Sequence, residues 1–143
     1  MIKNIIFDIG GVILKWDLDE MLDYFANNEE EKIFIRDNIF YTQEWAIGGE
    51  IDIGYITQYD FVKRIQKKTN HINDKLVENF ILGYYKLLKI KEEVIKLIKD
   101  LKERGYSVYI LSNINDYIVE KANLNSFLDI VDGYILSYQV HEI

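Results

Sequence analysis

The stretch FDIGGV, residues 7–12, places an acid and two adjacent glycines directly after an apolar run. Residues 2–7 are mostly β-branched or aromatic, which predicts a short buried strand. A carboxylate at Asp8 adds nothing to a core, and paired glycines weaken any regular element. We therefore expect a strand that ends at Phe7 and is followed either by an ordinary turn or by backbone that approaches a ligand closely.

Two further apolar runs predict buried strands, SVYILSN at 107–113 and residues 131–137. Helical patterns lie between the strands, at about 17–40, 53–68 with Asp52 as cap, 74–88, 90–104 with Gly105 as its terminal glycine, and 115–124. Strands separated by helices indicate an α/β fold, a Rossmann-like parallel sheet with helices on both faces. Because the first crossover is much longer than one helix requires, we also expect an inserted all-helical segment.

The composition narrows the range of partners. The chain has 143 residues, the length of one domain, with a net charge of −7 and no cysteine. The negative charge argues against nucleic acid and against anionic membranes as partners. Without cysteine neither disulfides nor thiolate metal sites can form. We see no signal peptide and no apolar run long enough to span a membrane, so a cytoplasmic location is expected.

Polar residues stand at the predicted carboxyl ends of the first two strands, where open α/β sheets bind ligands. Asp8 follows the first strand, and Ser112 and Asn113 close the second. Gly10 and Gly11 would let backbone N–H groups approach an anion. Together these residues suggest a phosphoryl site with a carboxylate nucleophile. Each residue taken singly is also compatible with an ordinary turn.

This order of motifs, FDIGGVI, a helical insert and then ILSN, resembles the haloacid dehalogenase-like (HAD-like) hydrolase superfamily, in its phosphatase branch with a helical cap. The resemblance implies that Asp8 is the nucleophile and that Ser112, with Asn113 beside it, binds the phosphoryl group. It also implies that Asp8 and the Gly10 carbonyl bind Mg²⁺. The domains would be an α/β core of residues 1–15 and 84–143 and a cap of residues 16–83.

The implied function is a Mg²⁺-dependent phosphatase that acts on a small phosphorylated metabolite through an aspartyl-phosphate. The sequence departs from the family at Gly10, where many members carry a second aspartate as general acid. The family's lysine is expected near SYQVHEI, residues 137–143, and its acidic metal-binding pair further on. The chain resembles the first two-thirds of such a protein, so we expect little or no catalysis and weak Mg²⁺ binding at best.

Other interpretations stay open at this point. A 2-haloacid dehalogenase would use the same aspartate, although the usual aromatic-Gly-Thr pattern is absent after Asp8. A non-catalytic binding or oligomerisation module is a second alternative. The resemblance implies that the neighbour of the first strand is a fourth strand that this sequence does not contain, so the first strand is expected at a sheet edge and suggests a homodimer. Four aromatic residues of the insert can line a pocket, although their spacing favours core packing. They are Trp16, Tyr41, Trp45 and Tyr55.

Overall fold

The structure, a computed structural model, describes residues 2–42, 45 and 49–143, and in this part of the chain the sheet has three strands. They are β1 (Asn4–Phe7), β2 (Ser107–Ser112) and β3 (Gly133–Leu136), in the order β1-β2-β3. Both pairs are parallel, with Phe7 opposite Ile110 and Ser112 opposite Leu136. The predicted parallel α/β sheet is confirmed.

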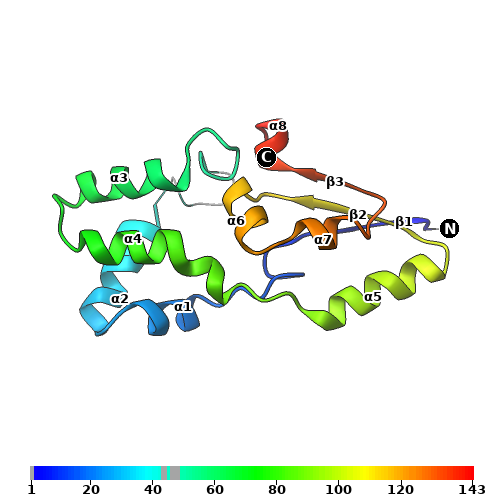
Figure 1. The fold of residues 1–143 in the computed structure, drawn as a ribbon, viewed down its shortest axis with the longest axis horizontal. Helices are drawn as coiled ribbons and strands as arrows, with labels where there is room; N and C mark the ends of the chain where they lie inside the picture. The colour runs from blue at the N-terminus through cyan, green and yellow to red at the C-terminus, as the bar shows by residue number, and fades with distance from the viewer. Residues whose placement is uncertain (1, 43–44, 46–48) are drawn as a thin grey trace.

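Four of the described helices lie on the sheet side of the molecule, three in the connections between strands and the last after β3 (Figure 1). They are α5 (Glu92–Glu103), α6 (Asp116–Lys121), α7 (Asn125–Leu128) and α8 (Ser137–Val140). Gly105 has φ +84°, a left-handed conformation that favours glycine, and it follows the end of α5 as the sequence predicts. Alternate strand residues such as Val108 and Ile110 are buried in the core, whereas Ile6 and Leu111 on the other face are exposed.

Between β1 and β2 the regular elements of the described residues are helices, apart from isolated bridges of Leu14 to Gly10 and to Ile90. In Figure 1 α1 to α4 gather at one end of the molecule, away from the sheet. They are α1 (Leu18–Phe25), α2 (Glu29–Ile35), the π-helical turn η1 (Arg36–Phe40), α3 (Gln58–Lys68) and α4 (Asp74–Gly83), followed by the 3₁₀ turn η2 (Tyr84–Leu87).

The single helix predicted at 17–40 is wrong, because the chain leaves the helical conformation after Phe25. Asn28 has an extended backbone, and its side chain accepts a hydrogen bond from the Glu31 N–H at 2.9 Å. This is an N-cap, so a new helix begins at Glu29. The apolar periodicity continues through the break and conceals it.

The predicted helix start at Asp52 is also wrong. The helix begins at Gln58, where Thr57 accepts a hydrogen bond from the Asp60 N–H at 3.1 Å and the Asp60 carboxylate accepts one from the Thr57 N–H at 3.1 Å. This reciprocal capping box satisfies two backbone donors at once. Asp52 lies in the preceding turn and takes part in the candidate site instead.

Asp132 ties the start of β3 to β2. Its carboxylate accepts hydrogen bonds from the Val108 N–H at 2.7 Å and from the Lys102 ammonium at 3.0 Å. These bonds favour the charged form, and the Val108 bond is the main reason that the pKa of Asp132 lies below its ordinary value.

We expect Asp132 to make the stability of the fold depend on pH. Since its pKa is lower in the folded chain than in the unfolded one, its contribution is complete at neutral pH and is lost as the pH falls below about 4. In urea unfolding followed at pH 7 and pH 3, Asp132→Asn should lose less stability on acidification than the wild type. Asp129→Asn, an exposed change nearby, should behave like the wild type. Equal losses in all three proteins would contradict this role.

A homodimer through β1 stays a prediction. Among the described residues β1 pairs only with β2, and Ile6 in this strand is 63% exposed. An apolar edge strand is a template for another chain. Light scattering should give the mass of two chains for the wild type and of one chain for Ile6→Lys, whose charge deters edge pairing. A monomeric wild type in dilute solution would exclude this dimer.

Candidate active site

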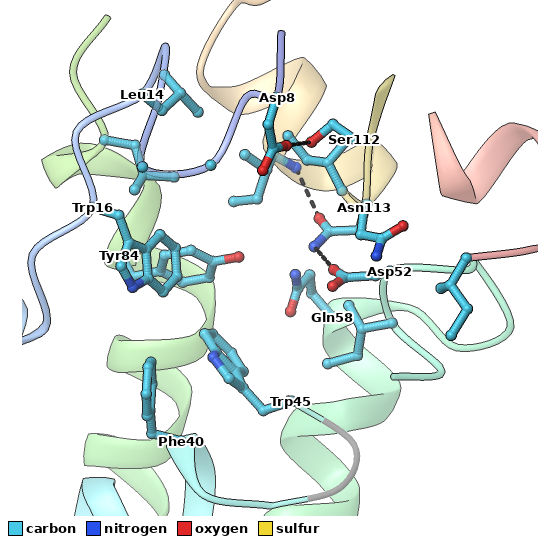
Figure 2. Close-up of a pocket in the computed structure, with 18 of the residues that line it drawn as sticks. Asp8, Leu14, Trp16, Phe40, Trp45, Asp52, Gln58, Tyr84, Ser112 and Asn113 are labelled. Carbon is cyan, nitrogen blue, oxygen red and sulfur yellow. Dashed lines mark hydrogen bonds between the residues drawn. The ribbon is translucent and has the colours of Figure 1, made fainter. Parts of the chain in front are cut away.

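The carboxylate after β1 and the hydroxyl at the end of β2 meet directly, as Figure 2 shows. Ser112 Oγ donates a hydrogen bond to Asp8 Oδ1 at 2.7 Å. Both residues stand at the carboxyl ends of neighbouring parallel strands, as the sequence predicts, and this arrangement brings their side chains together. They lie at the edge of the sheet where α/β folds bind ligands.

The Asp8 carboxylate is held by one oxygen. Its Oδ1 atom accepts the Ser112 hydrogen bond and a second one from the Ile9 N–H at 2.7 Å. Within the described residues Oδ2 has no hydrogen-bond partner. The carboxylate is therefore oriented through Oδ1 and keeps Oδ2 available for a ligand or for attack on an electrophile.

The loop after Asp8, which contains Gly10 and Gly11, folds back on itself. The Ile9 carbonyl accepts hydrogen bonds at 2.9 Å from the N–H groups of Ile13 and Leu14. Gly11 has φ +72°, so this position favours glycine for its backbone conformation. Gly10 has no such constraint and lines the cavity, and a Cβ added there would meet nothing within 4 Å. Lys91 anchors the loop from outside, because its ammonium donates to the Gly11 carbonyl at 2.7 Å.

A cavity of about 700 Å³ opens beside Asp8, between the sheet and the helical insert. Its lining includes all of the predicted site residues, Asp8, Gly10, Gly11, Ser112 and Asn113. The aromatic residues of the lining are Trp16, Phe40, Trp45 and Tyr84.

The favoured core-packing interpretation of the four aromatic residues of the insert is therefore wrong in part. Trp16 and Trp45 line the cavity while also packing on other rings. Tyr41 and Tyr55 are exposed side chains outside the cavity lining.

Tyr84 presents its hydroxyl group to the cavity (Figure 2). Its ring packs edge-to-face with Trp45 at a centroid distance of 5.0 Å and with Trp16 at 5.8 Å. Burial raises the pKa of its hydroxyl well above the ordinary value, and the nearby amides of Asn115 and Gln58 oppose this shift only in part. At neutral pH the hydroxyl is therefore protonated and able to donate a hydrogen bond.

Asp52 joins the insert to the core at the wall of the cavity. Asn115, the N-cap of α6, donates from Nδ2 to Asp52 Oδ1 at 3.4 Å. Ser137 donates to the Asp52 carbonyl at 2.5 Å and accepts from the Ile114 N–H at 3.0 Å. Residues after β2 and β3 thus fix the loop that carries Asp52.

Sequence reasoning missed four polar residues of the cavity wall. They are Asp52, Gln58, Tyr84 and Asn115. Asn115 could have been predicted from the sequence, because it follows the end of the second strand closely and precedes a helix. The other three lie in the insert or at its end, where their approach to Asp8 depends on tertiary packing.

A family model described as haloacid dehalogenase-like hydrolase matches residues 2–142, nearly the whole chain. The chain belongs to the haloacid dehalogenase-like hydrolases. For this HAD-like hydrolase the predicted family and fold are confirmed.

Among curated proteins, D-ribitol-5-phosphate phosphatase from Bacteroides thetaiotaomicron is 26% identical to the HAD-like chain over 148 aligned positions, which cover 98% of this chain and 69% of that enzyme. A HAD family enzyme from the same organism, solved in complex with magnesium and inorganic phosphate, matches with a TM-score of 0.69 at 26% identity. That match covers 100% of this chain and 72% of the other.

A solved dehalogenase matches with a TM-score of 0.60 at 18% identity, over 99% of this chain and 65% of the other, and this likeness shows the fold alone. In the part of the HAD-like chain that the structure describes, no helix is long and apolar enough to cross a membrane.

Proposed function

We propose that this HAD-like hydrolase is a phosphatase of small phosphorylated metabolites and that Asp8 is its nucleophile. The observation that carries the proposal is the 2.7 Å hydrogen bond from Ser112 Oγ to Asp8 Oδ1 at the mouth of a cavity of about 700 Å³. A carboxylate oriented by one oxygen, beside a hydroxyl donor, suits attack on a phosphorus atom. The similarity to D-ribitol-5-phosphate phosphatase supports the same reaction class.

In the proposed reaction Asp8 Oδ2 attacks phosphorus, the bond to the leaving oxygen breaks, and an aspartyl-phosphate forms. Water then attacks the phosphorus, which releases inorganic phosphate and restores the carboxylate. Gly10 stands where many members of the family carry an acid, so the leaving oxygen must take its proton from another donor, such as water. Protonation is therefore the step that this chain assists least.

We propose that Ser112, Asn113, Gly10 and Gly11 bind the phosphoryl oxygens. Ser112 can donate its hydroxyl to phosphate in place of Asp8, and the Asn113 side chain lines the same cavity. An open space of at least 4 Å around a Cβ at Gly10 suits close approach of an anion to the backbone. Backbone N–H groups of this loop would then donate hydrogen bonds to the phosphoryl oxygens and stabilise the negative charge that develops on them.

We propose the division into a core of residues 1–15 and 84–143 and a cap of residues 16–83 as the basis of substrate choice. The cap supplies Trp16, Phe40 and Trp45 of the cavity wall, and the core supplies Asp8, Ser112 and Tyr84. A cytoplasmic location for the enzyme stays a prediction.

Magnesium is the metal to test, because the related HAD family structure is a magnesium complex. The ligands that the resemblance assigns in this chain are the Asp8 carboxylate and the Gly10 carbonyl. The described residues contain no group of three or more His, Asp or Glu side chains placed to hold a metal. Since Mg²⁺ requires near-octahedral oxygen coordination, these residues do not form a complete site, and we assign no reaction step to the metal.

Weak magnesium binding is the expected outcome. Calorimetry on the wild type should give a Kd above about 1 mM, which is a small binding free energy. Tight Mg²⁺ binding that disappears in Asp8→Asn would show that the site around Asp8 is complete after all.

The test of the proposed function is hydrolysis of p-nitrophenyl phosphate, with and without Mg²⁺. The expected rate is low but above that of buffer, and Asp8→Asn should lower it to the rate of buffer, because a nucleophile is removed while its shape is kept. Asp129→Asn makes the same chemical change on the surface and should retain the wild-type rate.

Two results would overturn the phosphatase proposal. One is an Asp8→Asn variant as active as the wild type, and the other is a wild type with no hydrolysis in either condition. The second result would favour a binding or oligomerisation module.

A further inference from the structure

Gln58 is the one described residue with a buried side-chain amide that has no hydrogen-bond partner at either nitrogen or oxygen. The residue is 3% exposed and lines the cavity that contains Asp8. Buried polar atoms in native proteins are almost always paired, so an amide left unpaired on both sides requires an explanation. A ligand that enters the cavity can supply both partners.

The position of Gln58 is set by the chain around it. It is the first residue of α3, directly after Thr57 of the capping box. The box fixes the first turn of the helix through bonds of 3.1 Å in both directions between Thr57 and Asp60. The amide is therefore held at the cavity by a well-defined helix start.

The surroundings of Gln58 are polar on two sides and aromatic on the others. Figure 2 shows the amide pointing into the space between Asp52 and Tyr84, with Trp45 below it. The Tyr84 hydroxyl lies close enough for the Gln58 amide to oppose the rise of its pKa, although the two groups do not form a hydrogen bond of normal geometry. The amide therefore keeps a free donor and a free acceptor beside the Tyr84 hydroxyl, and a ligand hydroxyl in the cavity can bond to both.

The charge of the cavity restricts the rest of the ligand. Among the described residues of its lining there is no Lys, Arg or His, whereas Asp8 and Asp52 both carry carboxylates. A second phosphate or a carboxylate on the leaving group would meet negative charge without a compensating cation. The wall thus favours a neutral leaving group.

We propose that Gln58 binds a hydroxyl group of a neutral, polyhydroxylated leaving group, such as that of a polyol monophosphate. The amide nitrogen donates to the hydroxyl oxygen, and the amide carbonyl accepts a hydroxyl proton. Trp45 and Tyr84 pack against the carbon chain. This assignment rests on the proposed function, since the phosphate of the ligand must lie at Asp8 and Ser112 for the leaving group to enter the cavity.

Binding of D-ribitol 5-phosphate, measured by calorimetry, tests the role of Gln58. The Asp8→Asn background prevents turnover of the ligand. In that background the affinity for D-ribitol 5-phosphate should exceed that for inorganic phosphate. Gln58→Leu keeps the size of the side chain but removes both hydrogen-bonding groups. Added to this background, it should lower the affinity for D-ribitol 5-phosphate at least about tenfold. The loss for inorganic phosphate should be clearly smaller, since it lacks the leaving group.

Three controls make the result specific. Gln139→Leu, the same change at an exposed position outside the cavity lining, should leave both affinities unchanged. Fructose 1,6-bisphosphate, which carries a second phosphate, should bind more weakly than D-ribitol 5-phosphate. Circular dichroism of the Gln58→Leu variant should match its parent. If that variant does not fold, Gln58→Ala replaces it, with the same selective loss expected.

Equal affinities for D-ribitol 5-phosphate and inorganic phosphate would overturn the assignment, as would equal losses for both ligands in Gln58→Leu. Absence of binding by either ligand would overturn it as well. Failure of the phosphatase proposal would give a different result. Hydrolysis would then be absent or independent of Asp8, whereas the difference in affinity between D-ribitol 5-phosphate and inorganic phosphate could still be measured.

Discussion

The parallel pairing of β1 with β2 is the interaction on which the rest of the structure depends. The two strands are separated by a long helical stretch, yet Phe7 lies opposite Ile110 in parallel register. Parallel register brings both carboxyl ends to the same edge of the sheet, so that Asp8 and Ser112 come within hydrogen-bonding distance. An antiparallel arrangement would separate the same two residues by the length of the sheet.

The helical insert turns this sheet edge into an enclosed site. Its aromatic residues pack on one another across several segments, with Trp45 in contact with the rings of Phe61, Phe80 and Tyr84. The hydrogen bond from Ser137 to the Asp52 carbonyl fastens the insert to the end of the sheet. The nucleophile therefore comes from the core, whereas Gln58 and most of the aromatic residues of the cavity wall come from the insert.

Much of the core and its polar strand ends could be predicted from the sequence, because the determinants are local. An apolar run that stops at Asp8 and another that stops at Ser112 define both the strands and the residues beyond them. The cavity wall could not be predicted in the same way. Asp52 has the preference of a helix cap, but the reciprocal capping pair at Thr57 fixes a later start. The sequence pattern places Tyr84 in a predicted helix and gives no sign that it faces a cavity. Only the packing of the fold brings it there.

The start of α3 has a consequence for how this enzyme can diverge. Thr57 and Asp60 form their hydrogen bonds at the molecular surface, whereas the residue between them in the first turn, Gln58, is buried at the cavity. A substitution in the surface pair can shift or loosen the helix start and so move the amide without touching any residue that faces a ligand. Drift at solvent-exposed positions thus offers a gradual route to new substrate preferences, while the chemistry at the sheet edge is preserved.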